Sequence, residues 1–121
     1  MSQQDYKDTY VIGKTFLEEM VSEAAKRSEI LESLIQYGLG EDSISTHRVY
    51  LLAENYVINY KMISLVREIF KYSPLTEHEE TKKEEFIVRS QDMFMLQTLA
   101  LARQQVTTDL ENMTYLSLKL H

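Results

Sequence analysis

Apolar residues recur every seven positions along the first third of the chain, which is the spacing of an amphipathic α-helix. The repeat predicts a helix that begins near Asp5 or Asp8 and ends at Tyr37, with Gly38 terminating it and Gly40 prolonging the break. Two columns of the repeat would form a helix-packing seam. These columns are Tyr10, Leu17, Ala24, Leu31 and Gly13, Met20, Arg27, Leu34.

A second helical pattern fills the middle of the chain. Its start is predicted at Asp42, Ser43 or Ser45, each of which can cap a helix, and its end by Tyr72, because residues that precede a proline such as Pro74 avoid helical geometry. Two stripes of this helix are apolar, so it is expected at the centre of the bundle, antiparallel to the first helix. The stripes are Val49, Tyr56, Ile63, Phe70 and Leu51, Ile58, Leu65, Tyr72.

The last third of the chain keeps a helical stripe but is too long for one matching helix. Thr76, three residues before Glu79, has the spacing of a capping box, and apolar positions then continue to Leu120. One helix over this length would be ~65 Å long and would overshoot its partners. The segment therefore either breaks, at Ser90 or within 106–109, or pairs with another subunit.

Composition agrees with a helical fold. The 121 residues include only three Gly and one Pro, too few turn residues for a fold of many short strands. We expect an all-α, single-domain antiparallel bundle over residues 1–121, with three long helices of which the third is broken to give four. No cysteine is present, so disulfides and sulfur-ligated zinc are excluded.

The charge limits the classes of partner. A net charge of -6 argues against direct binding of nucleic acid, because phosphate contacts require concentrated positive charge. No segment approaches the ~20 apolar residues that span a bilayer, and the N-terminus lacks a basic start followed by an apolar run. We expect a cytoplasmic protein that does not bind membranes.

Neither a metal site nor a catalytic motif can be assembled from the sequence. His47 and His78 lack the glutamate three residues earlier that a carboxylate-bridged metal site in a bundle uses. Glu18, Glu19 and Glu23 resemble one half of a magnesium site, but the second helix supplies no matching group. We therefore expect no catalytic residue, no cofactor, no metal and no enzymatic activity.

Polar residues on apolar columns are the most informative positions. Arg27, Asn59 and Arg103 each interrupt an otherwise apolar column, and Asn59 is expected to fix helix register or oligomeric state. Around Asn59 the middle helix concentrates tyrosines, amides and arginines, which suit a protein interface or a small-ligand pocket. The candidate interaction or ligand residues are Arg48, Asn55, Tyr56, Asn59, Tyr60 and Arg67.

Two functions remain open. The first is a non-catalytic protein-interaction module that regulates or inhibits a partner protein through an apolar and tyrosine-bearing helix face, and that forms a homodimer. The alternative is a helical bundle that binds a small ligand or nucleotide, as a sensor or a sequestering protein. The second would require an enclosed pocket where tyrosine hydroxyls and an arginine converge.

Overall fold

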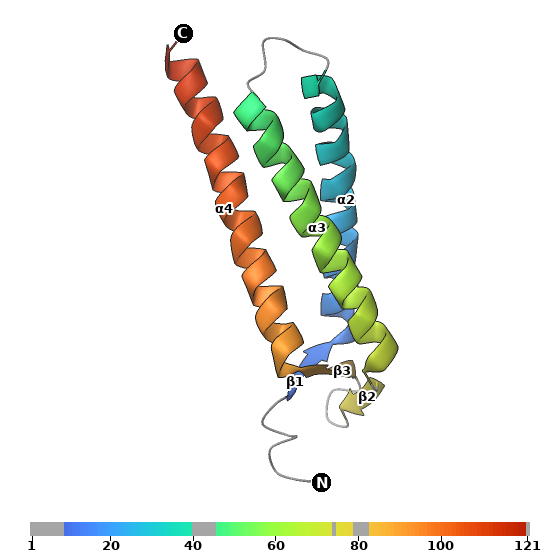
Figure 1. Ribbon diagram of the computed structural model, residues 1–121. Helices are drawn as coiled ribbons and strands as arrows, with labels where there is room; N and C mark the ends of the chain where they lie inside the picture. Colours follow the sequence, from blue (N-terminus) through green and yellow to red (C-terminus); the bar gives the residue numbers. More distant parts are fainter. Residues whose placement is uncertain (1–8, 40–45, 74, 79–82, 121) are drawn as a thin grey trace.

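A computed structural model of the chain describes residues 9–39, 46–73, 75–78 and 83–120. Three long helices form a bundle that is closed at one end by a small sheet (Figure 1). The elements are β1 (Thr9–Gly13), α2 (Lys14–Leu39), α3 (Thr46–Tyr72), β2 (Leu75–His78), β3 (Lys83–Arg89) and α4 (Ser90–Leu120). The chain is mostly helical, as predicted, but the all-α expectation is wrong because three strands are present.

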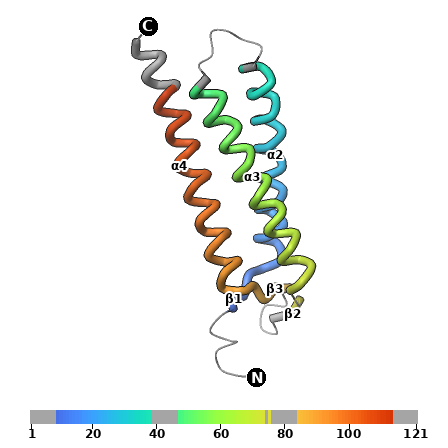
Figure 2. The backbone as a smooth tube through the Cα atoms, in the orientation of Figure 1, coloured from blue at the N-terminus to red at the C-terminus, as the bar shows by residue number. Residues whose placement is uncertain are grey.

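The helix α3 lies between α2 and α4 and is antiparallel to both (Figure 1). Each outer helix packs on α3, whereas no described Cα atom of α2 lies within 8 Å of one in α4. The tube view shows α2 and α4 farthest apart at the end away from the sheet (Figure 2). The predicted central position of the middle helix is confirmed.

The two columns of the first helix have different environments. Leu17, Ala24 and Leu31 of the first column are buried against the bundle. Leu34 of the second column is 41% exposed, because α4 does not reach α2 to cover it. The first column is thus a helix-packing seam, whereas the second is packed at Met20 and exposed at Leu34.

The N-terminal part of the first predicted helix is a strand. Residues 9–13 form β1, and the helix starts at Lys14 rather than near Asp5 or Asp8, which lie outside the described residues. The run Tyr10-Val11-Ile12 is aromatic and β-branched, which favours a strand once a partner strand is available. Tertiary pairing with β3 therefore outweighs the heptad spacing of Tyr10.

The end of the first helix also differs from the prediction. The helix continues to Leu39, so Gly38 is its penultimate residue and does not follow its end, while Gly40 lies outside the described part. Gly38 is buried and stands seven residues after Leu31, on the column that faces α3. It therefore extends the packing column by one further position.

The predicted end of the middle helix is confirmed at Tyr72. Its start is Thr46, and the predicted caps Asp42, Ser43 and Ser45 lie outside the described residues. After the helix, the Ser73 amide donates to the Ile69 carbonyl at 2.9 Å, and the Ser73 hydroxyl donates to the Ile87 carbonyl of β3. The side chain of Ser73 thus connects the end of α3 to the sheet.

The segment predicted to open a third helix is instead a β-hairpin. Thr76 pairs with Glu85 in β2–β3, so its capping-box interpretation is wrong, and Glu79 lies outside the described residues. Phe86 and Val88 are buried while the residues between and beside them are not, which is the period of a strand. The order of the antiparallel sheet is β1-β3-β2.

The third helix is unbroken. It begins at Ser90, one of the predicted break points, and runs through 106–109 without interruption, so the four-helix expectation is wrong. Its 31 residues span roughly 46 Å, close to the roughly 40 Å of the 27-residue α3. The predicted mismatch in length disappears because residues 75–78 and 83–89 are strands.

Apolar packing divides into two clusters. The sheet-end core joins the sheet to the adjoining ends of the helices and is built around Ile12, Leu17, Val66, Ile69, Phe86, Val88 and Leu96. A second cluster, the α3/α4 core, lies between α3 and α4 and is built around Leu51, Ile58, Met62, Leu99 and Val106. Met20 and Leu65 pack against both clusters.

Tyr72 connects three elements at the sheet end. Its hydroxyl donates to Asp92 Oδ2 of α4 at 2.5 Å and accepts the backbone N–H of Arg89 at 3.3 Å. The guanidinium of Arg89 lies over the Tyr72 ring, 4.1 Å from its centroid. Burial, with the hydrogen bond to Asp92, raises the pKa of Tyr72 above its ordinary value.

Candidate functional site

A cleft of about 470 Å³ opens between α2 and α4, where the two outer helices are not in contact. We call it the α2/α4 cleft. Arg27 lines the α2 wall of the cleft, and the residues that line the α4 wall are polar or small. The complete lining is Arg27, Ala100, Arg103, Gln104, Thr107, Thr108 and Glu111.

A buried amide pair on α3 holds the α4 wall of this cleft. Asn59 is fully buried, and its Nδ2 donates to both the backbone carbonyl and Oδ1 of Asn55, each at 2.8 Å. Asn59 Oδ1 accepts from Arg103 at 3.3 Å, and Asn55 donates to the hydroxyl of Thr107 at 3.4 Å. Because buried amides are costly without partners, this network favours one register of α4 on α3.

Arg103 is partly buried and has no counter-ion within the part of the chain that the structure describes. Its Nη1 donates to Asn59 Oδ1 and lies 3.5 Å from Met62 Sδ, which is a weak acceptor. No described carboxylate forms an ion pair with it. Burial and then the charge of Arg27 lower the pKa of Arg103, while Glu23 acts in the opposite direction with a smaller effect.

Arg27 is the second cation of the cleft. It is paired with Glu23, one helical turn earlier, through Nη2 at 2.8 Å and Nε at 3.2 Å, both to the same carboxylate oxygen. The hydrogen bond from Arg27 lowers the pKa of Glu23. Both side chains are largely exposed, at 41% and 56%, so this pair belongs to the rim of the cleft.

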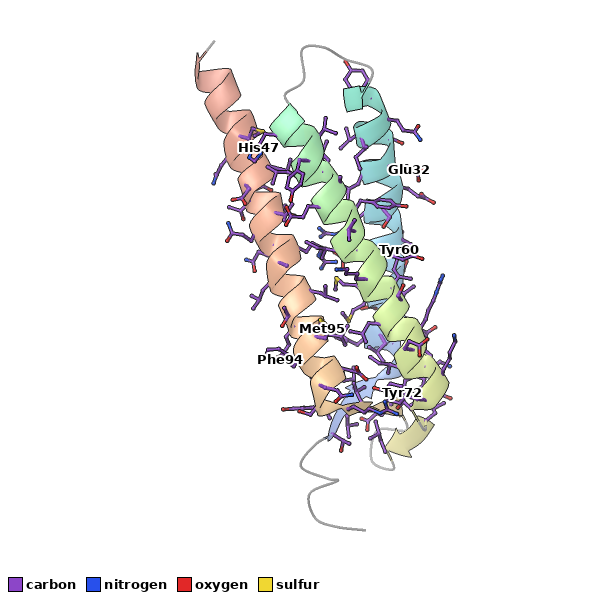
Figure 3. All side chains as sticks on the ribbon, viewed as in Figure 1. Glu32, His47, Tyr60, Tyr72, Phe94 and Met95 are labelled. Carbon is purple, nitrogen blue, oxygen red and sulfur yellow. The ribbon has the colours of Figure 1, made fainter. Side chains whose placement is uncertain are left out.

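The structure divides the predicted site residues into two groups. Asn55 and Asn59 are buried together beside the cleft, and Arg48 lies on the same helical face, eleven residues before Asn59. Tyr56 is partly buried. Tyr60 is exposed and lies on another flank of α3 (Figure 3). Arg67, seven residues later, is exposed on the same flank. The six residues therefore do not converge on one pocket.

The cleft residues missed by sequence reasoning come from the last helix. Arg103 was recognised only as an interruption of the apolar column Leu96 to Leu110. Thr107, one turn later on the same helix, carried no comparable signal. Their contact with the Asn55–Asn59 pair depends on how α4 is placed on α3, which the spacing of residues within one helix does not reveal.

A second hollow, of about 730 Å³, lies where β1 joins α2. It contains the ion pair between Lys14 and Glu84, 3.0 Å apart, beside Glu18 and Glu19. The described residues contain no group of three or more His, Asp or Glu side chains that could hold a metal ion. The acidic side chains of this hollow thus surround a lysine.

Comparison of the chain with protein-family models, with curated proteins and with solved structures finds no significant match. Within the described part of the chain, each helix is too short or too polar to cross a bilayer. The site can therefore be interpreted only from its own residues.

Proposed function

We propose that this protein is a non-catalytic interaction module that regulates or inhibits a partner protein, and that a helix of the partner docks in the α2/α4 cleft. The supporting observation is the distribution of exposed apolar side chains on α2. Ile30, Leu34 and Tyr37 are 61%, 41% and 61% exposed. All three fall on the side of α2 that carries Arg27, which lines the cleft.

The opposite flank of α2 differs in composition. Ala25, Glu29, Glu32 and Gln36 are exposed there, on positions that turn away from Arg27. An exposed apolar stripe limited to one flank of a helix is typical of a surface that a partner covers. The asymmetry thus favours the cleft side as the docking surface.

The shape and chemistry of the cleft suit a helical segment. Two helices on either side of α3 leave the position that a further helix occupies in a larger bundle. A partner helix would place apolar side chains against Ile30 and Leu34, and an acidic side chain toward Arg103, which lacks a carboxylate partner among the described residues. We therefore propose an amphipathic helix with at least one carboxylate as the ligand.

Leu34→Glu tests this docking mode, with Gln36→Glu as the matched control on the other flank. The full chain and both variants are used to capture proteins from cell extract, and amide hydrogen exchange of the purified complex maps the contact. We expect a protein that the wild type and the control retain, that Leu34→Glu loses, and that protects α2 and α4. Equal retention by all three, or protection elsewhere, would contradict the proposal.

Self-association is proposed on a different surface. Phe94 is 68% exposed and points away from the bundle (Figure 3). Leu101, seven residues later on the same face of α4, is 67% exposed. A second copy of the chain would cover them in a homodimer. Light scattering should give twice the chain mass for the wild type and the chain mass for Leu101→Glu. If Leu34→Glu disrupts the dimer, the second copy of the chain would instead be bound in the α2/α4 cleft.

The alternative function, binding of a small ligand or nucleotide, is favoured by one observation. Arg103 is a partly buried cation without a described counter-ion, and it lines an open cleft. The tyrosines expected to line such a pocket do not line this one. Any ligand would therefore be recognised by its charge more than by stacking on aromatic rings.

A further inference from the structure

We infer that Arg103, Arg27 and Thr107 form an anion site in the α2/α4 cleft that binds a carboxylate or phosphate group. This site would operate whether or not a partner helix docks there, because it rests on the charges and donors of the cleft itself. Its three residues come from two helices and line the same opening.

The balance of charge around Arg103 favours the binding of an anion. A partly buried guanidinium loses hydration, and this loss is normally compensated by a carboxylate. For Arg103 the described acceptors are a neutral amide oxygen and a thioether sulfur. The nearby Arg27 repels its charge more strongly than Glu23 attracts it. An incoming anion would supply the missing compensation.

The number of hydrogen-bond donors in the cleft also favours the binding of an anion. A guanidinium carries five N–H groups, and within the described part of the chain the hydrogen bonds of Arg103 use only Nη1, while those of Arg27 use Nε and Nη2. Thr107 and Gln104 add a hydroxyl and an amide to the lining. Guanidinium groups are well matched to planar carboxylates and to phosphate because they can donate two parallel hydrogen bonds.

The acidic residues nearby do not fill the site. Glu23 is occupied by Arg27 on the rim. Glu111, which also lines the cleft, stands eight residues after Arg103 and hence roughly 12 Å along the helix axis. The positive charge is thus local to the Arg103 end of the cleft.

The test is a titration of the full labelled chain with inorganic phosphate and, separately, with acetate, followed by NMR of the arginine Nε–Hε signals and the Thr107 amide. Sodium chloride at matched ionic strength is the control. We expect saturable shifts at Arg103, Arg27 and Thr107 with at least one of the two anions. Shifts that sodium chloride reproduces, or that do not saturate with either anion, would overturn the site.

Variants assign the binding to this cleft. Arg103→Gln should weaken anion binding by roughly tenfold or more, as loss of a charged hydrogen bond predicts. Arg27→Gln, at a more exposed position, should weaken it several-fold and keeps the test valid if Arg103→Gln impairs folding. Arg67→Gln, on another flank of α3, should bind as the wild type does. Equal weakening by Arg67→Gln would contradict the assignment.

The two probes also separate the sources of the anion. Preference for phosphate would indicate a phosphorylated ligand, whereas binding of acetate at least as tight would indicate a carboxylate such as an acidic side chain. Because neither probe needs a partner protein, anion binding without protein capture would uphold this site and reject the docking proposal. Capture that depends on Leu34, without anion binding, would do the reverse.

Discussion

The two ends of the bundle are built on different principles. At the sheet end, Leu17, Val66, Ile69 and Val88 have no exposed surface, and strands from distant parts of the chain join all three helices. Toward the other end, α2 and α4 are separated, and the contact between α3 and α4 includes a chain of amides, a threonine and an arginine. We therefore expect the sheet end to contribute most to stability, and we propose the open, polar cleft as the part that binds a ligand.

The sharpest test of this contrast compares the same substitution in both regions. Ile69→Ala in the sheet-end core should lower the free energy of unfolding by about 2–5 kcal/mol, because it removes fully buried methyl groups and leaves a cavity. Ile30→Ala on α2, three residues after Arg27, where the side chain is 61% exposed, should change it by about 0.5 kcal/mol or less. Urea denaturation measures both, and equal losses would contradict the contrast.

Asn59→Leu tests whether the polar network stabilises the fold. The substitution leaves Asn55 Oδ1 without its donor and Arg103 without its oxygen acceptor. We expect a loss of about 1–3 kcal/mol, the cost of unsatisfied buried polar groups. Asn112→Leu, on an exposed position of α4, is the control. Higher stability of Asn59→Leu would mean that the amide serves only to select register or assembly state.

Tyr72→Phe probes the connection between the sheet end and α4. Loss of the hydrogen bond to Asp92 should cost about 1 kcal/mol at neutral pH. Since the pKa of Tyr72 is raised in the folded state, its contribution is present below its unfolded pKa of about 10 and is lost as the pH rises through the folded pKa. Urea denaturation at pH 8 and above pH 10 should therefore show a smaller difference between the two proteins at the higher pH.

The smallest effect is expected at the rim of the cleft. Arg27→Gln removes an exposed ion pair with Glu23 and should change stability by about 0.5 kcal/mol or less. Thermal unfolding in low and high salt would measure it. A loss above about 1 kcal/mol would mean that Arg27 holds the cleft wall in place.

Much of the helical architecture follows from periodicity, but the sheet does not. The column from Leu17 to Leu31 and the end of α3 were predictable because they depend on residues within one helix. Residues 9–13 and 83–89 also fit a helical spacing, and only their pairing with each other makes them strands. That pairing joins residues 72 to 80 positions apart in the sequence, and periodicity within a single segment carries no information about such pairing.

The candidate site was predictable only in part. Asn59 was identified because a polar residue on an apolar column requires a partner, and the structure supplies Asn55 and Arg103. Tyr60 and Arg67 were grouped with it because they share its helix, yet they lie on another flank. The cleft could not be predicted from the sequence, because it lies between α2 and α4. These helices are separated in the sequence by α3 and the β2–β3 hairpin, and they are not in contact.

The pairing of β1 with β3 has a consequence for the width of that space. Strand β1 passes into α2 at Gly13, and β3 passes into α4 at Arg89, in each case without an intervening loop. Because the strands are antiparallel, with Thr9 opposite Arg89 and Gly13 opposite Glu85, the two helices leave the ladder from opposite ends, roughly 13 Å apart along it. The ladder is thus a molecular spacer, and adding or removing two residue pairs would reset the distance between the helix origins while each strand kept the same face toward the core.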